Sequence, residues 1–450
     1  MESDKMNHYA FYEALEENEG DPLADDAIDS LFYSASDIPQ NANILKDIRQ
    51  AKDQPACISF LKQVTFIPEW VCWGQIKRGQ EVFLRNAHAG CMALLHGSLV
   101  ASLACPEINA ILMAAHPIAW TDKGCTYQRM FETYHMVVEL LQEGGLRPES
   151  GAGWEAVVQV RLLHATVRAR LLKKRQDQKK KFDQPAPSSG TQKSCPVLGK
   201  AGEKNKRTPI SQWDMAFTLL TFSIVFLHAL ENIGIPLKQE DKEDFTHLWR
   251  YVGYIIGIKD QFNPCKTYEK SQIWLEMFFK EIKPNKLSAR LANHVLLSIE
   301  NQFPVFFPSD MHAFIAHQML GSQIASCLSI PSKSQLSFLT KVKAIIILFL
   351  LRMFSLLALI PCLDKKALEH NKGFVKFMRF ASLEGYLPEF HSLVRVKHPE
   401  ENAGSQKAAL IKIKMASIMN IFWKGMYIFS ICFSLLVLFL CFQKCVHVVY

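Results

Sequence analysis

Apolar side chains recur along most of this chain at intervals of three or four residues, the spacing of one face of an α-helix. No stretch shows the sustained alternation of apolar and polar residues that a half-buried β-strand requires. Gly and Pro separate the periodic stretches, as where Gly144 and Gly145 end the stretch that begins at Lys123. The pattern predicts an all-α fold of about a dozen helices, with helices expected at residues 43–66, 79–104, 106–116, 123–144, 157–174, 211–233, 238–258, 268–282, 288–300 and 310–326.

The run from Met426 to Phe442 contains no charged residue, and its apolar character extends back to Ile418. About 20 apolar residues cross the hydrocarbon core of a bilayer. Lys424 lies near the start of this extended stretch, where its side chain can reach the membrane interface. Three lysines precede the stretch and one follows it, a bias that places the bulk of the chain in the cytoplasm. We therefore expect a single-pass C-terminal transmembrane anchor at residues 416–443. A buried terminal helix is the alternative.

A second apolar run, from Ala344 to Leu363, has a similar length but carries Arg352 near its middle. An arginine at the centre of a bilayer is costly, and Pro361 ends the run early. We therefore expect either a buried core helix or a helix that lies along a membrane surface.

Composition narrows the class of protein. The 450 residues are 49% hydrophobic and 21% charged, which is enough for one large domain or two smaller ones. The twelve cysteines include no CxxC pair, and the first thirty residues lack the apolar core of a secretory signal peptide. Free thiols in a reducing compartment are therefore expected, and a disulfide framework is not.

Charge divides the chain into regions. Residues 1–38 are acidic and poorly periodic, which predicts a mobile arm. Residues 39–400 are expected to form one helical domain, interrupted by a basic flexible insertion at residues 173–209. Because this insertion contains almost no aromatic residues, we expect no nucleic-acid partner; solvation or attraction to anionic lipid explains its charge better.

One histidine stands out in the strongly helical stretch 157–174. His164 shares its helix face with four aliphatic residues: Val157, Val160, Val167 and Leu171. A buried imidazole requires a partner, and Arg161 and Arg168 flank this one. Haem would satisfy both features, because its iron takes an imidazole and its propionates take guanidinium groups. A core histidine bonded to a backbone carbonyl is the alternative.

In the predicted helix 123–144, Thr133 falls in the apolar arc and Arg129 lies one turn before it. Glu132 falls on the polar side. A solvated ion pair between Arg129 and Glu132 would contribute only about 0.3 kcal/mol, so it explains little about this arginine.

Four stretches together carry a resemblance to a known family. They are WGQIKRGQEVF (73–83), CTYQRMFET (125–133), VRLLHATVR (160–168), and SQWDMAFTLLTFS with HLWRYVGYIIGI (211–258). The chain resembles the family shared by latex-clearing rubber oxygenases and the endoplasmic-reticulum-bound oxygenase of mycophenolic acid biosynthesis. The spacing of Arg129, Thr133 and His164 is the most specific element.

In rubber oxygenases the corresponding histidine ligates haem b within a globin-like helical core. The resemblance implies that His164 is the proximal iron ligand and that Arg129 and Thr133 line the opposite side of the cofactor as catalytic residues. Rubber oxygenases also carry a functional glutamate about one helix length before the Arg-x-x-x-Thr motif. Residues 108–119 contain no acid, so polyisoprene cleavage itself does not follow.

These features together predict a haem b-dependent oxygenase. It would use O₂ to oxidise or cleave a C=C bond of a hydrophobic prenyl or lipid substrate at a membrane surface, with a redox partner that the sequence leaves unspecified. The alternative is a non-catalytic, tail-anchored helical scaffold that binds lipid or a partner protein. A multi-pass transporter would need several uncharged spans, and the sequence has one.

Overall fold

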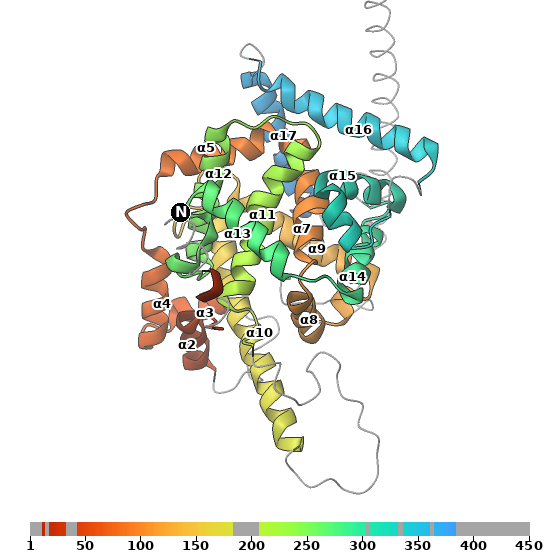
Figure 1. The fold of residues 1–450 in the computed structure, drawn as a ribbon. Helices are drawn as coiled ribbons and strands as arrows, with labels where there is room; N and C mark the ends of the chain where they lie inside the picture. The colour runs from red at the N-terminus through yellow and green to blue at the C-terminus, as the bar shows by residue number, and fades with distance from the viewer. Residues whose placement is uncertain are drawn as a thin grey trace, which may run out of the picture.

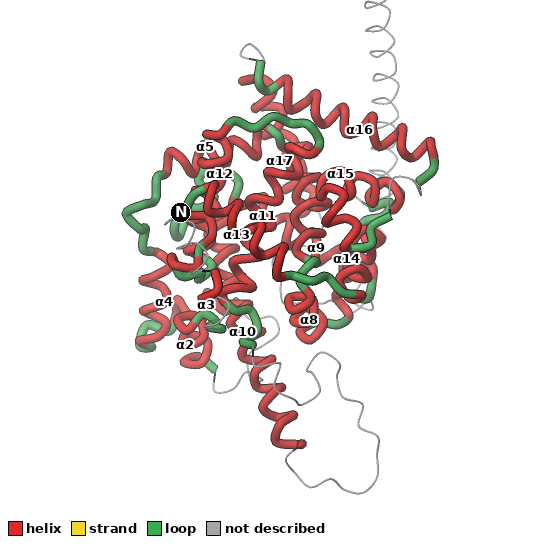
Figure 2. Tube along the Cα trace, in the orientation of Figure 1, coloured by secondary structure: helices red, strands yellow, loops and turns green. Residues whose placement is uncertain are grey.

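The computed structural model describes residues 11–13, 18–32, 43–182, 207–302, 306–331, 336–360 and 364–383. Within these ranges the chain is helical, with no strand, which confirms the all-α class (Figure 2). The described residues form more α-helices than the dozen expected, because several predicted helices are divided into short pieces.

The helices follow one another as α2 (Pro22–Leu31), α3 (Ile44–Gln50), α4 (Pro55–Thr65), α5 (Trp73–Arg85), α6 (Ala87–Met92), α7 (Leu99–Ser102), α8 (Pro106–Ala115), α9 (Lys123–Leu140), α10 (Ala152–Phe182), α11 (Gln212–Asn232), α12 (Gln239–Ile255), α13 (Tyr268–Glu281), α14 (Lys286–Ser298), α15 (Ser309–Cys327), α16 (Phe338–Leu357) and α17 (Asp364–Leu383). The predicted helix 79–104 is divided by a π-helical turn, Ala93–Ser98, between α6 and α7.

Helix α11 runs through the centre of the molecule (Figure 1). It begins at Gln212 because Ser211 and Asp214 form a capping box: the Ser211 N–H donates to Asp214 Oδ2 at 2.9 Å, and the Asp214 N–H donates to Ser211 Oγ at 3.3 Å. Its apolar side chains are buried on nearly every side, against α12, α13, α15 and the π-helical turn. The predicted helix 211–233 matches it closely.

Among the described residues, α11 is the helix with the length and apolarity of a membrane span, but 89% of its apolar window is buried inside the protein. The bent pair formed by Ala87–Ser102 and α8 passes the same test only if it is counted as one span, and its two parts meet at 94°. Helix α11 is therefore a core element of a helical body. In the bent pair, residues 87–102 are largely buried, whereas α8 has one fully buried residue. The expected anchor at 416–443 lies outside the described residues.

The N-terminal region differs from the expected mobile arm over residues 18–32. There α2 packs against α4 and α10, and Asp21 caps it by accepting from the Ala24 N–H at 3.4 Å. The acidic residues that suggested an arm are used inside the fold, because Asp21 is only 4% exposed. The other residues of region 1–38 are described only at 11–13.

The predicted basic insertion is also shorter than expected. Helix α10 continues to Phe182, so residues 173–182 extend it, and Arg175 reaches back to donate to the Arg207 carbonyl at 2.6 Å. The Thr208 N–H donates to Asn18 Oδ1 at 2.6 Å, which ties the far end of the insertion to the N-terminal region. Residues 183–206 lie outside the described residues.

Candidate functional site

Helices α9 and α10 form the pair that carries the predicted site residues. A Cβ atom at Gly153, near the start of α10, would lie 2.3 Å from the Cα atom of Leu140 at the end of α9. Only glycine allows the two backbones to come this close. Arg129 lies eleven residues before Leu140 (140 − 129) and His164 eleven after Gly153 (164 − 153), so both lie about 16 Å along their helices from this contact.

His164 is half-buried on α10, and its Nδ1 atom is buried with no hydrogen-bond partner among the described residues. The alternative of a core histidine bonded to a carbonyl through Nδ1 is therefore not what the structure shows. Burial, together with the nearby charge of Arg168, lowers the pKa of His164 to about 4. At neutral pH the imidazole is uncharged and keeps a lone pair for a ligand.

Arg161 is buried and fully used by protein groups. Its guanidinium donates to both carboxylate oxygens of Asp21, from Nε to Oδ2 at 2.6 Å and from Nη2 to Oδ1 at 2.9 Å. Its Nη1 donates to Gln63 Oε1 at 2.5 Å and to the Ile255 carbonyl at 3.2 Å. A bidentate arginine–carboxylate pair of this kind fixes the rotation of α10 about its axis.

Arg168 makes a similar set of contacts one turn beyond His164. Its side chain is 2% exposed and pairs with Asp25 of α2. Its Nε donates to the Pro209 carbonyl at 3.1 Å and its Nη2 to the Ile210 carbonyl at 2.8 Å. The two arginines expected to face haem propionates therefore have carboxylates of the N-terminal region as their partners.

On α9, Arg129 and Glu132 form a pair that is far from solvated. Arg129 Nη1 donates to Glu132 Oε2 at 3.1 Å, and the Glu132 side chain is only 1% exposed. Gln128 Nε2 donates to the other carboxylate oxygen at 3.2 Å. The Thr133 hydroxyl donates to the Arg129 carbonyl at 3.1 Å. The solvated pair that was the alternative for Arg129 is not what the structure shows, because the Glu132 side chain is buried.

The structure adds two residues that the sequence did not indicate. His116 follows α8, and burial together with the charges of Arg129 and Arg170 lowers its pKa to about 4. His116, Arg129 of α9 and Arg170 of α10 are therefore close enough for their charges to interact. These residues are 13 and 41 positions apart along the chain (129 − 116 and 170 − 129), and no local pattern relates them.

A profile of the family described as ER-bound oxygenase mpaB/B'/Rubber oxygenase, catalytic domain, matches residues 85–345. The chain belongs to this family. A solved structure described as latex clearing protein LCP in the closed state is similar, at 16% identity and a TM-score of 0.49. The match covers 75% of this chain and 89% of that one. A search of curated proteins finds no significant match.

All the predicted site residues of this oxygenase-family chain fall inside the matched segment, on α9 and α10. The N-terminal carboxylates that pair with Arg161 and Arg168 fall before it. Asp21 and Asp25 therefore lie outside the part of the chain that the family profile matches.

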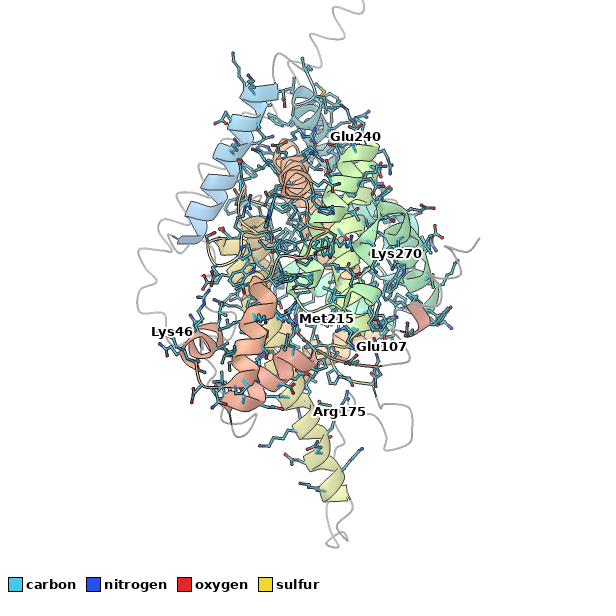
Figure 3. All side chains as sticks on the ribbon, turned by 90° about the vertical axis from the view of Figure 1, so that its left-hand side faces the viewer. Lys46, Glu107, Arg175, Met215, Glu240 and Lys270 are labelled. Carbon is cyan, nitrogen blue, oxygen red and sulfur yellow. The ribbon has the colours of Figure 1, made fainter. Side chains whose placement is uncertain are left out.

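A cavity of about 210 Å³ lies beside α8 and the part of α10 that follows His164, and His164 is not one of its lining residues. Leu171, two turns after His164 on the same face, forms part of its wall, together with Ala110, Ile111 and Ala114 of α8. Glu107 and Arg175 lie at its polar edge, towards the projecting end of α10 (Figure 3). The family's catalytic segment thus has an apolar hollow between α8 and α10, about 10 Å from the histidine.

A metal site made only of protein side chains is not found here. Within the described ranges, no group of three or more His, Cys, Asp or Glu residues is arranged to hold an ion. His96, in the π-helical turn, is a core residue that bonds to His312 at 2.8 Å and to the Met92 carbonyl at 3.1 Å. A metal at His164 would need its other ligands from a cofactor.

Proposed function

We propose that this chain is a haem b-dependent oxygenase that acts on a hydrophobic, unsaturated prenyl or lipid substrate. Family membership supports the oxygenase class. The observation that carries the cofactor assignment is His164, a neutral imidazole whose buried Nδ1 has no partner. A neutral histidine nitrogen is the axial ligand of haem iron in many haem proteins.

The lining of the cavity beside α10 fits a haem in chemistry. The facing sides of α8 and α10 carry aliphatic side chains that suit the ring, and Arg175 and Arg207 supply cationic groups at its polar edge. The fit in size requires movement, because a cavity of about 210 Å³ is below the roughly 300–1,000 Å³ of typical ligand sites. Helix α8 is the element we expect to move, since Asn109 is its one fully buried residue.

When bound, haem supplies the activation of O₂ that an oxygenase requires. The chain itself positions groups around it. Glu132 holds the Arg129 guanidinium in a fixed orientation on α9. Thr133 directs its hydroxyl hydrogen to the Arg129 carbonyl, which leaves the oxygen free to accept. Arg161 and Arg168 hold the His164 helix in place through Asp21 and Asp25.

Membrane attachment is the second part of the proposal. The family description names an ER-bound oxygenase. The apolar segment at 416–443, in which Lys424 near the start is the one charged residue, would anchor the chain by one C-terminal span, with its bulk in the cytoplasm. A lipophilic substrate partitions into the bilayer, so attachment would keep the enzyme on the membrane that holds its substrate.

Oxygen uptake tests this function. Full-length protein in detergent, supplied with haem and a chemical reductant, should consume O₂ with squalene and not with squalane, its saturated counterpart. Arg129→Gln should lower the rate by roughly 10²-fold if it removes a donor directed at the reacting group. Arg147→Gln is the control. Arg147 lies in the loop after α9 and stacks on the ring of Trp73 in α5, away from Arg129.

Equal uptake with both hydrocarbons would contradict a reaction at C=C bonds. If both arginine variants consume O₂ as fast as the native protein, Arg129 is not part of the site. A protein that binds both hydrocarbons but consumes no O₂ would support the alternative, a lipid-binding scaffold with the family fold.

A further inference from the structure

Helix α16 lies across one end of the molecule with an apolar face turned outwards (Figure 1). Phe338, Ile345 and Phe349 are 82%, 56% and 44% exposed. They are seven and four residues apart, so they share one side of the helix. Large apolar side chains arranged in this way are normally covered by another surface.

The inward side of α16 is also apolar. Ala344, Ile347 and Leu351 are buried against neighbouring helices, chiefly α15, α6 and α17. A helix that is apolar on all sides normally lies in a protein core or in a lipid environment. Of the two expectations for 344–363, a helix buried on all sides does not agree with the outward side of α16, and a helix that lies along a membrane surface stays a prediction.

A groove of about 620 Å³ runs beside the exposed face, between α16, α15 and the end of α11. Its apolar wall is formed by Ile233, Phe314, Ile345, Leu348 and Phe349. Lys341 and Arg352 stand at its edge, three turns apart on α16. The groove thus combines a volume typical of ligand sites with an apolar wall and a cationic rim.

The charges on α16 all have one sign. The helix carries Lys341, Lys343 and Arg352 and no acidic residue. Within the described residues, no carboxylate forms an ion pair with any of the three. The Arg352 guanidinium lies over Gly234, just after the end of α11, within about 3.2 Å of where a Cβ would be. These cations are available to an anionic surface.

We propose that α16 docks onto an anionic phospholipid bilayer, with Phe338, Ile345 and Phe349 inserted at the headgroup boundary. Apolar side chains flanked by unpaired Lys and Arg are the composition of helices that lie in a membrane interface. Arg352 in its middle prevents α16 from spanning the bilayer. This inference deepens the membrane attachment in the proposed function, and it does not depend on haem.

Photocrosslinking in the full chain tests the proposal. Phe349→p-benzoylphenylalanine is reconstituted with vesicles of phosphatidylcholine containing phosphatidylserine, irradiated, and analysed by mass spectrometry for lipid adducts. The matched control is Phe66→p-benzoylphenylalanine. Phe66 is 58% exposed and follows α4, which lies at the other end of the molecule in Figure 1. We expect lipid adducts at position 349 and a background level at position 66.

The charges are tested in the same assay. Lys341→Gln and Arg352→Gln should each reduce the lipid-adduct yield at position 349 by about fivefold, because each basic residue near an anionic surface contributes about that factor. Vesicles of phosphatidylcholine alone should show a larger loss, because they remove the contributions of all the basic residues together. Flotation of the protein with vesicles at high salt reports the C-terminal anchor separately, since that contact does not depend on charge.

Three results would overturn the proposal. Adducts at position 349 that are no more frequent than at position 66 would show that no membrane covers this face. Adducts to residues 416–443 would show that the chain covers its own groove. Adducts to α16 of a second copy would show a dimer contact. None of these results bears on haem binding, which is read from the absorption spectrum.

Discussion

At the scale of single residues, the protonation of His164 decides whether it can serve as an iron ligand. Only the neutral imidazole has a free lone pair, so haem and the proton compete for it. Burial and Arg168 lower the pKa of His164 to about 4. Haem affinity should therefore stay level from pH 8 to about 5 and fall as pH approaches 4. Haem titration by absorbance across this range, with circular dichroism to confirm folding, measures it.

An affinity that instead declines through pH 6.5 would show that His164 has an ordinary pKa, and that its surroundings in the folded protein are wetter than the structure shows. An affinity that does not change even at pH 4 would point to a ligand other than a histidine.

The Asp21–Arg161 pair is the second residue-scale feature. Removal of one member of a buried ion pair leaves an unpaired charge, at a cost of about 3–5 kcal/mol. Asp21→Ala should therefore lower the melting temperature strongly. The double variant Asp21→Leu/Arg161→Met should recover much of that loss, because it removes both charges. Thermal unfolding followed by circular dichroism measures both.

A solvent-exposed ion pair provides the comparison. Lys77 and Glu143 lie 2.8 Å apart, and both side chains are more than half exposed. Glu143→Ala should leave the melting temperature unchanged within error. If Asp21→Ala were equally silent, the N-terminal region would not hold α10, and the positioning role given to Arg161 would fail.

At the scale of elements, the contact between α9 and α10 sets how far Arg129 and His164 are shifted relative to each other along the two helix axes. Gly153→Ala would place a methyl group 2.3 Å from Leu140 Cα, so one backbone must move. We expect a loss of about 1–3 kcal/mol in the free energy of unfolding. Haem binding should weaken as well, since Arg129 and His164 would no longer lie at the same height along the two helices.

Gly373→Ala in α17 is the matched control. A Cβ atom at Gly373 would meet no atom within 4 Å. The same substitution there should stabilise the protein by about 0.5–1 kcal/mol, because alanine favours helix more than glycine does. Equal effects at both positions would show that the contact at Gly153 does not limit the packing of α9 and α10.

Most elements were predictable from the sequence, because helix periodicity and capping residues are local. Predicted helix 123–144 and α9 start at the same residue, Lys123, where Asp122 caps the helix. The partners of Arg161 and Arg168 were not predictable, because Asp21 and Asp25 lie more than a hundred residues earlier. The meeting of His116 with Arg129 likewise depends on tertiary packing, which no local pattern reports.

At the scale of the whole molecule, several buried histidines make stability depend on pH. Burial is the largest factor that lowers the pKa of His88, His96 and His116 to about 4 each. An unfolded chain binds protons at these sites near pH 6.5, so between pH 6.5 and 4 it holds more protons than the folded protein. The free energy of unfolding should therefore fall as pH is lowered through this window.

His88→Phe tests how much His88 contributes to this pH dependence of the free energy of unfolding. The ring of His88 stacks on Phe374 at 4.1 Å, and phenylalanine keeps an aromatic ring there without a titrating group. The slope of stability against pH below 6.5 should decrease by up to about 1.4 kcal/mol per pH unit. Denaturant melts at pH 5, 6 and 8 measure this slope. An unchanged slope would show that His88 titrates alike in both states.

The central claim is that α10 presents a neutral histidine to haem iron. The direct test is the absorption spectrum of full-length protein in detergent during a haem titration. A Soret band should form with the native protein and with His228→Ala, which changes a half-buried histidine of α11 bonded to Gln272. The band should be lost or displaced in His164→Ala. A native protein with no Soret band, or His164→Ala with an unchanged one, would contradict the claim.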